Sequence, residues 1–195
     1  MRAPSGRPLY GAQYSRLLKA PRYEILALVF VRQPGFLLDR DSAHLKAVLG
    51  GKTVQDVGLL PKHLDEEVIQ KAWERGLIIV TANQDDFIRK IYRFQQKQQE
   101  SDCHDLFGLV VVPNKNFDAQ RVLGPLKRGI RIEGKDLSRR DIHDQNLFVH
   151  VERSGRVDVK RFPMCFYCKK LKVRDVPEWL ERLQVVGLPK PKVTQ

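Results

Sequence analysis

The fold is decided by one stretch of the sequence, LIIVTANQDD at residues 77–86. Leu77–Val80 is short and fully apolar, which predicts a buried strand. The polar residues after it open an amphipathic pattern that predicts a helix over 85–99. A buried strand that leads directly into a helix is typical of parallel sheets with helices packed on them.

The same alternation of strand and helix continues on both sides of this stretch. Upstream, the pattern predicts a strand at Phe36–Leu38, a helix at Ser42–Leu49, a strand at Thr53–Val57 and a helix at Asp65–Gly76. Downstream, it predicts a strand at Leu106–Val112 that Pro113 closes. The chain is therefore predicted to have an α/β fold with a mainly parallel central sheet.

Charge and composition divide the chain into three segments: a basic N-terminal arm with a candidate extra strand (1–34), the core (35–113) and a C-terminal α+β extension (114–195). The extension is predicted to hold an interrupted helix (Asp118–Arg128), a hairpin (Leu147–Val151 with Arg156–Lys160) and a short helix (Val176–Leu183). Residues 1–34 carry 6 basic and 1 acidic residue, 35–100 carry 10 and 10, and 101–195 carry 19 and 12.

The composition excludes several classes of protein. With 195 residues and 42% hydrophobic residues the chain can bury a core as one domain. No apolar run approaches the ~20 residues of a membrane span, and the N-terminus lacks the apolar core of a signal peptide. An odd number of cysteines argues against a disulfide scaffold. We therefore expect a cytoplasmic protein. The net charge of +12 suits a polyanionic partner, either nucleic acid or an anionic membrane surface. The membrane surface ranks last because the sequence shows no amphipathic basic helix.

Acidic and amide side chains recur where predicted strands end and helices begin. Asp39 ends the first strand of the core, Asp65 opens a helix, and Asn83 and Asp86 follow the next strong strand just past Thr81. Strand carboxyl ends and helix amino ends share one edge of a parallel sheet, so these groups should converge. Crowded carboxylates repel unless a cation neutralises them, and oxygen ligands suit Mg²⁺ or Mn²⁺. Taken singly, each acid is better explained as a turn or helix-capping residue, and only their recurrence at successive strand–helix junctions favours a metal site.

The order and spacing of these motifs resemble the PIN-domain ribonucleases, over about residues 36–112. The resemblance is closest to small bacterial and archaeal PIN-like proteins, which include toxins of toxin–antitoxin pairs. It implies a three-layer α/β/α sandwich, Mg²⁺ or Mn²⁺, and hydrolysis of RNA phosphodiester bonds. It also implies a site at Asp39, Asp65, Asn83 and Asp86, with Thr81 orienting it. Glu66 and Glu67 compete with Asp65 for the middle position, and the neutral Asn83 weakens any second metal position.

Basic residues beside aromatic ones are candidate RNA contacts, because cations bind phosphates and rings stack on bases. These candidates are Arg16, Lys19, Arg156, Lys160, Arg161, Lys169 and Lys170. The pair Cys165 and Cys168 is half a zinc site without a second matching pair, and we interpret it as structural.

Two functions follow from the sequence. The first is a metal-dependent endoribonuclease, with a protein inhibitor of the antitoxin kind as a partner. The second is a non-catalytic RNA- or ribonucleoprotein-binding module that has kept a PIN-like fold, which the neutral Asn83 and the basic flanks also fit.

Overall fold

The computed structural model describes residues 34–60, 62–97, 108–127, 129–132, 135–162 and 182–190. All of them belong to the compact unit Pro34–Gln195. The predicted arm, the cysteine pair and most of the predicted helix Val176–Leu183 lie outside the described residues.

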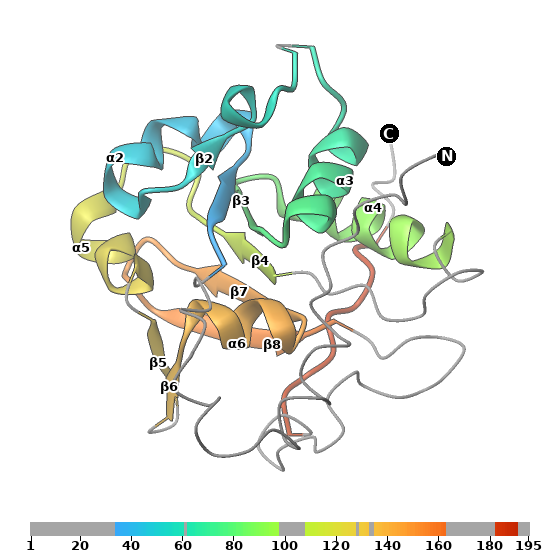
Figure 1. Cartoon of the computed structure of the whole chain (residues 1–195). Coiled ribbons are helices and arrows are strands. Elements are labelled where there is room, and N and C mark those ends of the chain that lie inside the picture. Colours follow the sequence, from blue (N-terminus) through green and yellow to red (C-terminus); the bar gives the residue numbers. More distant parts are fainter. Residues whose placement is uncertain are drawn as a thin grey trace, which may run out of the picture. The chain divides into compact units, whose positions relative to one another are not determined.

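A six-stranded sheet forms the centre of this unit, and it is mostly parallel (Figure 1). Its strands, in spatial order, are β2 (Lys52–Thr53), β1 (Phe36–Leu38), β3 (Ile78–Thr81), β4 (Gly108–Val111), β7 (Leu147–Val151) and β8 (Val157–Arg161). Only β8 runs antiparallel to its neighbour, as the second strand of the predicted hairpin. The expectation of an α/β fold with a mainly parallel sheet is thus confirmed, and β7 and β8 show that the predicted extension contributes to the sheet.

The helices follow the strands as expected, with small shifts at their ends. They are η1 (Arg40–Leu45), α2 (Lys46–Leu49), η2 (Gln55–Val57), α3 (Asp65–Arg75), α4 (Gln84–Lys97), α5 (Ala119–Leu123), η4 (Gly124–Lys127) and α6 (Arg139–Asp144). The predicted strand Thr53–Val57 is only partly right, because a 3₁₀ turn follows β2 within that range. Two elements were not predicted from the sequence: α6, and the small antiparallel pair β5 (Ile130–Ile132) and β6 (Lys135–Leu137). No helix in the described part of the chain has the length and apolar character needed to span a membrane.

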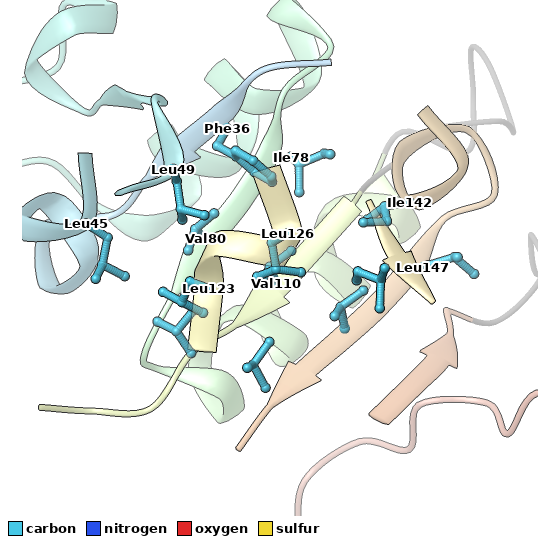
Figure 2. Packing of buried hydrophobic residues seen from close by; sticks show 14 of the residues in the cluster. Phe36, Leu45, Leu49, Ile78, Val80, Val110, Leu123, Leu126, Ile142 and Leu147 are labelled. Atoms are coloured by element: carbon cyan, nitrogen blue, oxygen red, sulfur yellow. The ribbon is translucent and has the colours of Figure 1, made fainter. Parts of the chain in front are cut away.

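Alternate residues of each strand supply separate hydrophobic clusters on the two faces of the sheet. On one face, Phe36, Ile78 and Val80 pack with residues of α2, α5 and α6, as Figure 2 shows. On the other face, Leu37 and Ile79 pack with residues of α3 and α4. Each fully buried Leu, Ile or Phe contributes about 1.5–3 kcal/mol to folding. Burial on both faces explains why these strands read as continuous apolar runs in the sequence.

Gly50 and Gly51 have structural roles at the end of α2. Gly50 ends the helix with a left-handed φ of 68°, a conformation that glycine adopts without steric cost. A Cβ on Gly51 would lie 2.9 Å from the carbonyl oxygen of Phe36, so the close approach of this segment to β1 requires glycine.

Residues 182–190 pair with the last residue of β8, Arg161. The backbone of Arg161 donates to the Gln184 carbonyl (3.0 Å) and accepts from the N–H of Val186 (2.9 Å). Helix α4 holds the same segment, since the Tyr92 hydroxyl donates to the Val186 carbonyl and Arg89 donates to the Lys190 carbonyl (2.7 Å).

Candidate functional site

The strand order places a topological switch point between the ends of β1 and β3. From β1 the chain continues to β2 on one side, and from β3 it continues to β4 on the other (Figure 1). Open parallel sheets bind ligands at such a switch point, outside the carboxyl ends of the strands. Asp39 directly follows β1, and Thr81 is the last residue of β3. The two residues therefore flank the switch point, at the carboxyl edge of the sheet.

A short chain of hydrogen bonds fixes the Asp39 carboxylate. The Asp39 N–H donates to the Val80 carbonyl (2.9 Å), which continues the sheet ladder to the end of β1. The Thr81 hydroxyl donates to Oδ2 of Asp39 (3.1 Å) and accepts from the N–H of Asn83 (3.0 Å). Asp39 is only 5% exposed. Its position is thus set by the core rather than by a loop.

Asp39 is electrostatically unfavourable where it lies. Burial raises the pKa of its carboxyl group above the ordinary value, and the negative charges of Asp65 and Asp41 raise it further. The N–H of Arg40 and the Thr81 hydroxyl lower the pKa, but they offset only part of this effect. A cation at this carboxylate would remove the cost of its buried charge.

Asp65 lies at the same edge, where it already has a cationic partner. It is the first residue of α3, and its Oδ2 lies 2.6 Å from Nζ of Lys90 on α4. Glu66 lies 3.6 Å from the same ammonium group. Burial acts to lower the pKa of Lys90, but the hydrogen bond and charge of Asp65 and the charge of Glu66 raise it overall, so Lys90 stays charged.

The other predicted acids are less central. Glu67 caps α3, because its carboxylate accepts a hydrogen bond from the N–H of Leu64 (2.8 Å). The exposed Asp86 accepts a hydrogen bond from the side-chain amide of Asn83 (2.8 Å). Of the three candidates for the middle position, Asp65 is the one whose charge acts on Asp39.

His63 is a site residue that the sequence analysis missed. Its Nε2 lies 3.8 Å from Oδ1 of Asp39, and its Nδ1 lies 2.9 Å from the Leu60 carbonyl oxygen. The side chain is only 4% exposed, although Leu60 and Leu64 on the same loop are 76% and 65% exposed. The one available signal in the sequence was that His63 lies two residues before Asp65, next to the predicted amino end of a helix at the carboxyl edge of the sheet.

The acidic side chains at the carboxyl edge of the sheet are suited to a cation that binds only one or two protein ligands. Among the residues that the structure describes, no three His, Cys, Asp or Glu side chains are grouped so as to hold a metal ion. The predicted acids Asp39, Asp65 and Asp86 thus do not form a three-carboxylate cage. Mg²⁺ needs no such cage, because it usually binds one or two carboxylates and keeps several waters.

The described RNA-contact candidates lie on the β7–β8 hairpin and differ in their exposure and in their polar partners. The Arg156 side chain is largely exposed, and its Nε lies 4.0 Å from Glu152. Lys160 lies 3.3 Å from Asp158 on the same strand. Arg161 is half-buried and donates to the Leu183 carbonyl (3.4 Å), so it also holds the C-terminal segment. The remaining candidates, Arg16, Lys19, Lys169 and Lys170, lie outside the described residues, as do Cys165 and Cys168.

Comparison with known proteins gives no match, whether to a family model, to a curated protein or to a solved structure.

Proposed function

We propose that the chain is a metal-dependent ribonuclease with a PIN-like, three-layer α/β/α core. The observation that carries this proposal is Asp39, a buried carboxylate with a raised pKa at the switch point of a mostly parallel sheet. Keeping such a group costs stability, which a function in binding a cation explains.

In this proposal the residues of the carboxyl edge divide the work. Asp39 would hold Mg²⁺ or Mn²⁺, Thr81 orients the Asp39 carboxylate, and Asp65 adds negative charge beside it. A bound divalent ion supplies an activated water and stabilises the charge that develops on a phosphoryl group. The net charge of +12 and the exposed Arg156 on the hairpin favour RNA as the polyanion.

A second function has one specific observation in its favour. Lys90 places an ammonium group on Asp65 and Glu66, at the edge where a metal ion would bind. A resident cation of this kind suits a module that binds RNA or a ribonucleoprotein without cleaving it. In either case a protein inhibitor or a ribonucleoprotein would be a partner of this basic chain.

One experiment separates the two functions. A labelled single-stranded RNA is incubated with the protein plus Mn²⁺, Mg²⁺ or EDTA, and binding of the same RNA is measured at equilibrium. The nuclease proposal expects cleavage that EDTA abolishes, loss of cleavage in Asp39→Asn, and retained cleavage in the control Asp56→Asn. Tight binding without cleavage in any metal would instead support the binding module.

A further inference from the structure

We infer that His63 is a nitrogen ligand of the metal site, so that Asp39 and His63 together select a divalent transition metal ion over Mg²⁺. This inference rests on the proposed function, because it assigns the class of metal that the Asp39 site takes.

The hydrogen bond between Nδ1 of His63 and the Leu60 carbonyl fixes the orientation of the imidazole ring and the position of Nε2. The Leu60 carbonyl can only accept, so Nδ1, 2.9 Å away, must carry a proton. This contact leaves Nε2, the other ring nitrogen, facing Oδ1 of Asp39. A cation bound by both atoms would take the Nε2 lone pair as a ligand and neutralise the carboxylate charge.

The distance between these two atoms is close to the separation of two ligands on one metal ion. At 3.8 Å, Nε2 and Oδ1 are beyond the ~2.7–3.2 Å range of a direct hydrogen bond. A tetrahedral ion with ligands at about 2.0–2.1 Å holds two donor atoms roughly 3.3 Å apart. The pair therefore needs to close by only a few tenths of an ångström to bind such an ion.

Burial supports a dedicated role for His63. The loop exposes two leucines and buries the imidazole, which is the reverse of the usual preference of these residues. The side chains of His63 and Asp39 are both more than nine-tenths buried. Each has a polar partner on its far side, the Leu60 carbonyl for His63 and the Thr81 hydroxyl for Asp39. A shared ion would add a partner at Nε2 and Oδ1, the two atoms that face each other.

The donor set determines which ion is favoured. Imidazole nitrogen suits Zn²⁺, Fe²⁺ and Co²⁺, and Mn²⁺ accepts it more readily than Mg²⁺, which prefers oxygen ligands. With only two protein ligands, the remaining positions stay open to water and to a phosphate oxygen. The site would thus bind metal weakly when free and more tightly with a nucleic acid.

The test compares His63→Asn with His143→Asn by metal binding alone. An asparagine amide retains a donor near the position of Nδ1 but removes Nε2, so the loop contact to Leu60 is preserved. His143 is a matched control, because its Nδ1 also lies 2.9 Å from an aspartate oxygen, that of Asp144. It lies near Gly76, before the start of β3, and therefore away from the carboxyl ends of the strands.

Two readouts are used: the affinity for Mn²⁺ with competition by Mg²⁺, and the electron spin echo of bound Mn²⁺, which detects a coordinated imidazole nitrogen. We expect the echo signature in wild type and in His143→Asn, and its loss in His63→Asn. The Mn²⁺ affinity should fall about tenfold or more in His63→Asn, while the Mg²⁺ affinity changes less than about twofold.

Two other outcomes have distinct meanings. In the first outcome, Mn²⁺ binds to wild type but not to Asp39→Asn, the echo shows no nitrogen signature, and the Mn²⁺ affinity of His63→Asn is unchanged. This outcome would overturn the inference and leave the proposed function standing. Equal Mn²⁺ binding in wild type and Asp39→Asn would overturn both. Circular dichroism and thermal melting of each variant show whether it has folded.

Discussion

Two neighbouring parallel strands are each followed by an aspartate, and the two aspartates lie in opposite electrostatic environments. Asp56, three residues after β2, accepts hydrogen bonds from Lys46 (2.7 Å) and from the N–H and hydroxyl of Thr53 (2.8 and 2.9 Å). The hydrogen bond from Lys46, with those from Thr53, lowers the pKa of Asp56 to about 2. Asp39, after β1, has a raised pKa because it is buried beside other acids.

This difference separates a structural carboxylate from a candidate functional one. Asp56 has its partners within the fold, so its charge stabilises the turn after β2. Asp39 has a charge that the fold only partly compensates, and in the proposed function a bound cation compensates the rest. A sequence shows only an acid after a strand in both cases, whereas the partners decide which kind of residue each one is.

The largest expected difference between the two aspartates is in catalysis. Asp39→Asn should reduce Mn²⁺-dependent RNA cleavage by at least about 100-fold, because the amide binds metal far more weakly. Asp56→Asn should change it by less than about twofold. Single-turnover cleavage of one labelled RNA measures both variants, with RNA binding retained in each. Equal loss in both would mean that folding, and not the site, is affected.

Replacing Lys90 should raise the metal affinity of the site around Asp39. Lys90→Met removes the cation that pairs with Asp65 and Glu66, so Mn²⁺ should bind about threefold to tenfold more tightly. The control is Lys71→Met, which breaks a similar pair with Glu74 (2.7 Å) elsewhere on α3 and should leave the affinity unchanged. Calorimetric titration checks both. Unchanged affinity in Lys90→Met would show that Lys90 does not compete with the metal.

The stability of Asp39→Asn should change in the opposite direction to its activity. The pKa of Asp39 is raised in the folded state, so ionising it costs stability as the pH rises through that value. Asp39→Asn should therefore melt about 2–4 °C above wild type at pH 7 without metal, roughly 1 kcal/mol for a chain of this size. Below about pH 3, where most aspartate side chains are protonated even in unfolded chains, the difference should vanish. A variant less stable than wild type at pH 7 would contradict this assignment.

Asp56→Asn should show the smallest effect and the reverse pH dependence. The pKa of Asp56 falls from 3.8 to about 2 on folding, so its stabilising effect is complete above pH 4 and is lost as the pH falls through 2. The variant should melt about 1–2 °C below wild type at pH 7, as expected for an exposed pair. Melting curves across this pH range test the prediction, and a higher melting temperature at pH 7 would contradict it.

The part of the site that follows from strand ends was predictable. Asp39 and Thr81 could be placed because apolar runs fix where β1 and β3 end, and the ends of parallel strands share one edge. The Asp65–Lys90 pair could not, because it joins residues 25 apart through the packing of α3 on α4. His63 lies in an irregular loop that has no periodicity to reveal what its side chain contacts. The hairpin was found from its alternation, whereas α6 and the β5–β6 pair are too short for a clear pattern.

The segment at residues 182–190 also bears on self-association. A sheet with an open edge exposes backbone groups on which another chain can add a strand, and a sheet this apolar would then aggregate. Here Gln184–Val186 occupies part of the outer side of β8 through hydrogen bonds with Arg161, and the opposite edge is formed by β2, which has only two residues. Among the described residues, the short β2 and the covered Arg161 end of β8 thus leave a second chain less backbone to pair with at these two places.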